Sequence, residues 1–226
     1  MVSWFNIFRE YLPSFLQGAA VTLELTAVGL LIGFVLGLGL AVARTYGPKW
    51  LRVIAIGYLE LFRGTPLLVQ LFLIYYGLPS LGLTLSQTLS AYLALGLNSA
   101  AYQAEYFRGA IQSIGESQMT AGRAIGLSRW KTIWYVILPQ ALRLVIPAWS
   151  NEPISLLKTT AVVFLIAVQD LMAKAKRAAT DTYDPISSYL AVAVVYLVMV
   201  FILNEVLKYL ERKSRIPGFE MESKKP

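Results

Sequence analysis

The feature that most constrains the fold is a run of 26 residues, 18–43, in which Glu24 is the only charged side chain. A helix of roughly 20 apolar residues is long enough to cross a bilayer. Further apolar runs occupy residues 51–78, 88–107, 140–167 and 187–207. With 57% hydrophobic and 15% charged residues, the chain lacks the polar surface of a large soluble domain. The sequence therefore predicts an all-α integral membrane protein with five transmembrane helices.

The segments outside these spans complete the predicted organisation. Residues 1–17 are rich in aromatic side chains and lack the pattern of a cleaved signal peptide, so we expect a retained interfacial helix. The membrane domain covers residues 18–212, with a polar loop at 112–139, a loop or short surface helix at 169–185, and a charged tail at 213–226. Gly29, Gly33 and Gly37 have the spacing of closely packed membrane helices, either within this chain or at a subunit interface.

The distribution of lysine and arginine predicts the orientation. If the N-terminus is outside, the cytoplasmic segments hold fourteen of these residues and the external segments hold four. Cytoplasmic loops of membrane proteins carry the excess of positive charge. We therefore expect the N-terminus outside, the C-terminus inside and the 112–139 loop in the cytoplasm.

The chain lacks the residues that several classes of function require. The net charge of +7 is spread between apolar runs, which favours contact with lipid headgroups over nucleic acid. The chain has no histidine or cysteine, no phosphate-binding loop and no metal-ligand spacing. We expect neither an enzyme nor a cofactor or metal site in this chain. Polar groups at mid-membrane favour a solute pathway instead.

The cytoplasmic loop is patterned as a helical hairpin. Ser117 is expected to cap a first helix that ends at Gly126, where the backbone becomes left-handed. Ser128 is expected to cap a second helix that ends near Pro139. Three small residues in the first helix allow another backbone to approach closely: Ala121, Gly122 and Ala124.

The second span is interrupted near its middle. Pro66 cannot donate an amide hydrogen bond and disfavours helix at Thr65, so we expect a kink that frees carbonyl groups. Glu60 and Arg63 lie three residues apart at this kink. They either form a structural ion pair or line a pathway.

The third and fourth spans hold the polar groups that a pathway requires. Pro147 and Pro153 are expected to break the fourth span where its charges lie. The candidate pathway residues are Asn98, Tyr102, Asn151, Glu152, Ser155 and Lys158. The alternative is an ion pair of Lys158 with Glu152 or Asp170 that closes a kinked helix.

Three motifs, taken with the hairpin, resemble one protein family. They are Phe-Arg-Gly-Thr-Pro-Leu-Leu-Val-Gln at 62–70, Asn-Ser-Ala-Ala-Tyr at 98–102, and Ile-Leu-Pro-Gln-Ala-Leu-Arg at 137–143. Together with Gly126 and the Val-x-Leu-Pro at 136–139, the chain resembles permease subunits of binding-protein-dependent ABC importers for polar amino acids. Their loop begins Glu-Ala-Ala, where this chain has Thr120-Ala121-Gly122.

The resemblance implies the type I importer permease fold, with the 112–139 loop acting as a coupling helix in a groove of a separate ATPase. It implies these coupling residues: Thr120, Ala121, Gly122, Arg123, Ala124, Gly126, Leu127 and Ser128. It also implies a second permease subunit, two ATPase subunits that bind ATP and Mg, an external binding protein, and a prokaryotic inner membrane.

The substrate is narrowed by Glu152, since a buried carboxylate is costly unless a cation pairs with it. Arginine, lysine or histidine would supply that cation. If Lys158 already does so, glutamine or another polar amino acid fits equally well. The rival functions are an ATP-independent carrier or channel, and a membrane scaffold.

Overall fold

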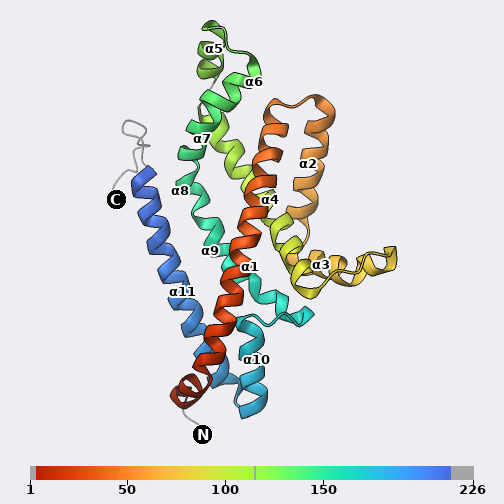
Figure 1. Cartoon of the computed structure of the whole chain (residues 1–226), viewed down its shortest axis with the longest axis vertical. Coiled ribbons are helices and arrows are strands. Elements are labelled where there is room, and N and C mark those ends of the chain that lie inside the picture. Colours follow the sequence, from red (N-terminus) through yellow and green to blue (C-terminus); the bar gives the residue numbers. More distant parts are fainter. Residues whose placement is uncertain (1–3, 115, 215–226) are drawn as a thin grey trace.

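The structure is a computed structural model that describes residues 4–114 and 116–214. Helices joined by short turns make up this part of the chain, and no strand occurs among the described residues (Figure 1). The all-α prediction is confirmed. The first residues of the predicted interfacial helix, 1–3, and most of the predicted tail, 215–226, lie outside the described residues.

Helix α1 (Trp4–Tyr46) is 43 residues long and includes Pro13. At 1.5 Å per residue it measures about 64 Å, roughly twice the hydrocarbon thickness of a bilayer. The helix is continuous through residue 17, but its first turns near the N-terminus lie at an angle to the rest (Figure 1), and the interfacial role of 1–17 stays a prediction. Gly18 lies at this point because a Cβ there would be 2.8 Å from the Cα of Leu171, not because a helix ends.

Three glycines of α1 pack against α4 (Gln87–Ser113), which begins at its N-cap Ser86. A Cβ would lie 3.2 Å from Leu95 at Gly29, 2.8 Å from the Ser99 hydroxyl at Gly33, and 2.9 Å from the Ala100 carbonyl at Gly37. The contacts advance in the same direction along both helices, so α1 and α4 are parallel. Of the two alternatives for this spacing, the structure shows packing within the chain.

The second apolar run is broken into two arms. Helix α2 (Lys49–Gly64) is followed, after Thr65 and Pro66, by α3 (Leu67–Phe72), a π-helical turn (Leu73–Gly77) and a 3-10 turn (Leu78–Leu81). The arms meet at 104°, and α3 projects from the bundle (Figure 1). The predicted kink is confirmed, and it turns the chain by more than a right angle. The single span over 51–78 stays a prediction.

Side-chain amides donate hydrogen bonds to the backbone carbonyl groups at this break. The Gln70 amide donates to the carbonyls of Phe62 at 2.8 Å and Thr65 at 3.0 Å. The Asn98 amide donates to the same Phe62 carbonyl at 3.2 Å. These bonds replace the helical partners that Pro66 removes.

The hairpin and the fourth apolar run form one segmented path. Helix α5 (Glu116–Ala124) precedes α6 (Arg129–Thr132), a π-helical turn (Ile133–Ile137), α7 (Leu138–Leu144), α8 (Ile146–Trp149), α9 (Asn151–Thr159) and the 3-10 segment η4 (Thr160–Ile166). The halves Arg129–Leu144 and Ile146–Ile166 meet at 50°.

One of the three expectations for the prolines of this path is wrong. The second hairpin helix does not end near Pro139, which lies in the first turn of α7, where its missing amide costs little. Pro147 adjoins the 50° bend, as expected. Pro153 lacks the amide that would bond to the Trp149 carbonyl, and the helix is interrupted at Ser150, between α8 and α9, as expected.

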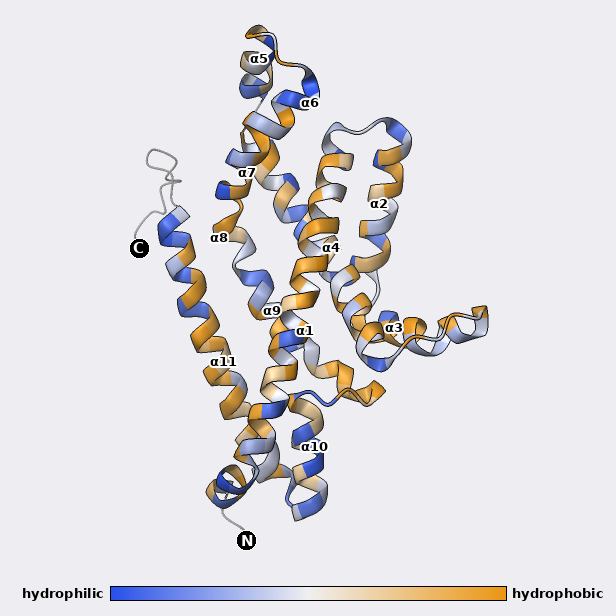
Figure 2. Cartoon of the chain, viewed as in Figure 1, coloured by the Kyte–Doolittle hydropathy of each residue, from blue (hydrophilic) through white to orange (hydrophobic). Residues whose placement is uncertain are grey.

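The last two helices are α10 (Leu171–Thr182) and α11 (Pro185–Ser214). The region predicted as a loop or short surface helix is largely α10, which packs between α1 and α11 and buries Leu171, Ala175 and Ala178. Apolar residues dominate α1 and α11 (Figure 2). Among the described residues, two helices are long and apolar enough to cross a membrane, or four if each bent pair counts. The count of five stays a prediction.

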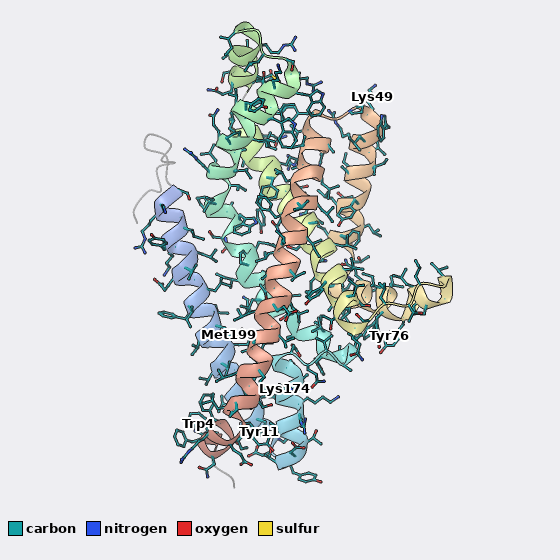
Figure 3. The ribbon with its side chains drawn as sticks, in the orientation of Figure 1. Trp4, Tyr11, Lys49, Tyr76, Lys174 and Met199 are labelled. Carbon is teal, nitrogen blue, oxygen red and sulfur yellow. The ribbon has the colours of Figure 1, made fainter. Side chains whose placement is uncertain are left out.

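The bundle has two distinct ends. The hairpin α5–α6 and the loop carrying Lys49 lie at one end, while Trp4, Tyr11 and Lys174 lie at the other (Figure 3). Helix α11 runs from the Lys174 end toward the hairpin end (Figure 1). The described parts of the basic segments that we assigned to one side therefore lie toward the same end.

Candidate functional site

A cavity of about 550 Å³ lies between the broken second run, α4 and α9. The break contributes Arg63, Gly64, Thr65, Pro66 and Leu67; α4 contributes Asn98, Tyr102 and Tyr106; α9 contributes Glu152, Ser155, Leu156 and Thr159. Four of the six predicted pathway residues therefore line one space: Asn98, Tyr102, Glu152 and Ser155.

Glu152 is the buried acid of this cavity. Its side chain is 5% exposed, and its Oε1 accepts a hydrogen bond of 2.7 Å from the Ser99 hydroxyl. Gln103 donates to Ser99 at 3.0 Å, and the Trp149 indole donates to Gln103 at 2.8 Å. This network fixes the carboxylate against α4, while no described lysine or arginine lies within ion-pair distance of it.

Lys158 takes no part in the ion pairs that we considered as an alternative. It is exposed, and neither Glu152 nor Asp170 pairs with it among the described residues. Asp170 is instead the N-cap of α10, where it accepts from the Ala173 amide at 2.9 Å. The spacing explains this, because Glu152 and Lys158 are six residues apart and point to different faces of α9. Asn151 also lies outside the cavity lining.

Of the two alternatives for Glu60 and Arg63, the ion pair between them does not form, whereas Arg63 lines the cavity. Glu60 is exposed on α2, whereas Arg63 turns to Glu105 of α4, with 3.4 Å between its Nη1 and the carboxylate Oε1. Arg63 also lies over the Tyr102 ring, 5.8 Å from its centroid. The break after Gly64 ends α2 at the cavity wall, so its last arginine reaches α4.

The hairpin has the turn that its sequence predicts. Gly126 has a φ of +86°, and Ser128 caps α6 by accepting from the Lys131 amide at 3.3 Å. Ser117 is not the cap of α5, which already begins at Glu116. The Arg129 guanidinium donates to the Tyr46 carbonyl at 3.2 Å, so the hairpin contacts the end of α1.

The candidate coupling residues divide between two environments. Gly122 is buried, and a Cβ there would lie 2.5 Å from the Thr132 methyl group, so it packs inside the hairpin. Leu127 is half-buried. The others are exposed: Thr120, Ala121, Arg123, Ala124, Gly126 and Ser128. The small exposed surface of α5 therefore consists of Ala121 and Ala124.

Sequence reasoning missed the residues that support the cavity. Ser99 and Gln103 hold Glu152, Gln70 holds the break, and Tyr106 and Thr159 add to the lining. A signal was present for Ser99 and Gln103, which are polar residues four apart in an apolar run. Gln70 is a polar residue in an apolar run just after Pro66, and its amide reaches back to the carbonyls of Phe62 and Thr65.

Comparison with known proteins agrees with this arrangement. Residues 33–216 match the model of the family described as the binding-protein-dependent transport system inner membrane component. The chain is 38% identical over 207 residues to the glutamine transport system permease protein GlnP of Escherichia coli (strain K12), covering 91% of this chain and 94% of GlnP. It is 38% identical over 205 residues to the arginine transport system permease protein ArtQ of Bacillus subtilis (strain 168), covering 90% and 94%.

A solved structure shows the same architecture. A chain in the crystal structure of an amino acid ABC transporter with histidines superposes with a TM-score of 0.85 at 36% identity, covering 94% of this chain and 99% of that one. The chain thus belongs to the binding-protein-dependent transport system inner membrane components, as a permease of the polar amino acid ABC importers.

Proposed function

We propose that this permease forms the transmembrane pathway for a basic amino acid, arginine, lysine or histidine, and that Glu152 binds the cationic side chain. Permeases of this family are not enzymes, and ATP hydrolysis belongs to a separate subunit. The single observation that carries the proposal is a buried carboxylate in a polar cavity, held in place by Ser99 and left without a described cation.

The energetics of Glu152 favour a cationic cargo. Removing a carboxylate from water costs several kcal/mol unless an opposite charge repays it. The hydrogen bond from Ser99 repays only part of this, since it is worth about 1.5–3 kcal/mol. A guanidinium or ammonium group entering the cavity supplies the rest.

The other groups of the cavity suit an amino acid backbone. Asn98 uses its amide hydrogens on the Phe62 carbonyl and on Gln70 at 3.0 Å, which leaves its carbonyl oxygen free among the described contacts. That oxygen is an acceptor for the α-ammonium group of the cargo. Glu152 then remains available for the side chain.

The exposed polar face of α9 supports a shared pathway between two permease subunits. Asn151, Ser155 and Lys158 are exposed and recur at the spacing of one helical face. Polar side chains at membrane depth must face protein or water. We assign this face to the boundary with a second permease subunit, of the same or a different chain.

The other subunits of the importer are inferred from the family. Importers of this kind combine permease subunits, ATPase subunits and a binding protein. We propose two ATPases, binding ATP and Mg, that grip the exposed face of α5, and an inner membrane orientation with the N-terminus outside. The basic segments at the hairpin end of the bundle support that orientation (Figure 3).

Glutamine is the second candidate substrate, because GlnP is named for glutamine transport and ArtQ for arginine transport at the same identity. With glutamine, Glu152 would bind the α-ammonium group that every amino acid carries. The two assignments differ in how a Glu152 variant treats different cargoes.

The test is uptake by proteoliposomes that contain the permease, its ATPase and one fixed binding protein. Glu152→Gln removes the charge but keeps the acceptor for Ser99. We expect arginine uptake to fall by roughly 10- to 100-fold, the value of one charge-assisted contact, with glutamine uptake changed little. The matched control is Glu60→Gln, which neutralises an exposed acid outside the cavity and should leave uptake unchanged.

Two outcomes would count against the assignment. Wild-type arginine uptake in Glu152→Gln would remove the residue from recognition. An equal loss of arginine and glutamine uptake would indicate that Glu152 binds the α-ammonium group, and glutamine would again be an equal candidate.

A further inference from the structure

Three arginines from three helices meet at one carboxylate beside the cavity. Arg108 of α4 binds Oε2 of Glu105 through Nη2 at 2.7 Å and Nε at 2.8 Å. Arg44, in the last turn of α1, donates from Nη1 to Oε1. Arg63, at the end of α2, has its Nη1 at 3.4 Å from the same Oε1. The cluster thus carries two more positive charges than negative ones.

The three arginines do not hold Glu105 equally. Arg44 and Arg108 form hydrogen bonds, whereas the 3.4 Å contact of Arg63 is too long for a good one. The Arg63 side chain is 44% exposed, compared with 26% for Arg44 and 28% for Arg108. When Arg63 leaves Glu105, the carboxylate therefore keeps two closer partners.

Arg63 is also the arginine of this cluster that lines the cavity. Its guanidinium lies over the Tyr102 ring, which orients the group while leaving its N–H edge free to bind. A guanidinium matches the two oxygens of a carboxylate, and this fork geometry selects carboxylates over other acceptors. The excess positive charge of the cluster adds attraction for an anion.

We propose that Arg63 is the specificity-determining residue that receives the α-carboxylate of the cargo, and that Glu105 is a positioning residue that holds Arg63 while the cavity is empty. Cargo binding exchanges one carboxylate for another on Arg63, and no charge is left unpaired, because Arg44 and Arg108 remain on Glu105. This assignment rests on the proposed amino acid cargo and extends it.

The exchange explains why three arginines share one acid. If Arg63 were the sole partner of Glu105, the departure of Arg63 would leave a part-buried carboxylate unpaired, which costs several kcal/mol. The two closer arginines remove that cost, so that Arg63 can move. The cavity then offers a cation from α2 and an anion, Glu152, from α9 for an amino acid.

The experiment is direct binding to the purified permease–ATPase complex in detergent, without the external binding protein, so that any discrimination belongs to the complex. Each amino acid that binds is compared with its decarboxylated amine, such as arginine with agmatine. We expect wild type to prefer the amino acid by roughly 10- to 100-fold. Arg63→Gln should lose this preference, because the amino acid binds more weakly to the variant while the amine binds as before.

Two further variants separate recognition from folding. Arg63→Lys keeps the charge but not the fork and should retain an intermediate preference. Arg143→Gln removes an exposed arginine that lies outside both the cavity lining and the Glu105 cluster, so its preference for the amino acid should match that of wild type.

An unchanged preference in Arg63→Gln, or an equal loss of preference in Arg143→Gln, would overturn the assignment of Arg63 while leaving amino acid transport intact. Failure of the wild-type complex to bind any amino acid would instead overturn the proposed cargo, and the role of Arg63 with it.

Discussion

Gly126 joins the two helices of the hairpin, and its replacement by valine tests how this joint works. Its φ of +86° is left-handed, and α5 ends there with two hydrogen bonds: Gly126 N to the Arg123 carbonyl at 3.0 Å and Leu127 N to the Gly122 carbonyl at 3.1 Å. A Cβ at Gly126 would meet no atom within 4 Å. The cost of Gly126→Val is therefore backbone strain and not a clash.

The magnitude follows from the conformation alone. A branched residue in the left-handed region costs about 1–2 kcal/mol, which changes a conformational equilibrium by roughly 5- to 30-fold. Relief of the strain breaks the two terminal bonds and turns α5 relative to α6. If α5 transmits ATPase closure, the ATP hydrolysed per amino acid transported should rise several-fold, with insertion of the chain unchanged.

Gly82 provides a matched control at the far end of the α3 arm. It has a φ of +84°, forms the same pair of bonds to Pro79 and Leu78, and a Cβ there also meets nothing within 4 Å. Gly82→Val should carry the same strain without changing the ratio of hydrolysis to uptake. Both are measured in proteoliposomes with the ATPase. A wild-type ratio in Gly126→Val, or an equal rise in Gly82→Val, would refute the reasoning.

Two further predictions concern stability and are measured by thermal unfolding in detergent. Gly37→Ala should destabilise by roughly 1–3 kcal/mol, because its Cβ would be 2.9 Å from the Ala100 carbonyl, whereas Gly39→Ala, with open space, should be neutral; equal effects would contradict this packing. Burial raises the pKa of Asp170, between η4 and α10, from 3.8 to about 6. Since the folded-state pKa lies above the unfolded value, the contribution of Asp170 to stability is full below pH 3.8 and is lost as pH rises through about 6, a change of about 3 kcal/mol. Asp170→Asn should remove this pH dependence of stability. If the dependence persists in the variant, another group causes it.

The helical class and the break at Pro66 could be predicted, because both depend on local chemistry. Apolar runs of bilayer length must be helical. Pro66 lacks an amide hydrogen, so the break beside it follows from that residue alone. The left-handed turn at Gly126 followed from a glycine placed before a serine cap.

The charge pairs could not be predicted, because they depend on which helices become neighbours. Arg63 and Glu60 are close in sequence, yet the 104° turn after Gly64 directs Arg63 to Glu105. At that turn Gln70 and Asn98 both donate to the Phe62 carbonyl, and Asn98 belongs to another helix. No periodicity in the second run contains this information.

The cavity was predicted only in part, for the same reason. Glu152 stood out as an acid within an apolar run, but its support, Ser99, lies 53 residues away on α4. The close approach of α1 and α4 through three glycines fixes where α4 presents Ser99. The sequence shows the glycines but not the helix that packs on them.

The most direct test of the account is arginine accumulation by proteoliposomes that contain the permease, its ATPase and the binding protein, with ATP supplied on the ATPase side. We predict accumulation against a concentration gradient that requires hydrolysable ATP and persists when ion gradients are dissipated. Accumulation that continues without ATP and disappears with the ion gradients would contradict the account and identify an ATP-independent carrier.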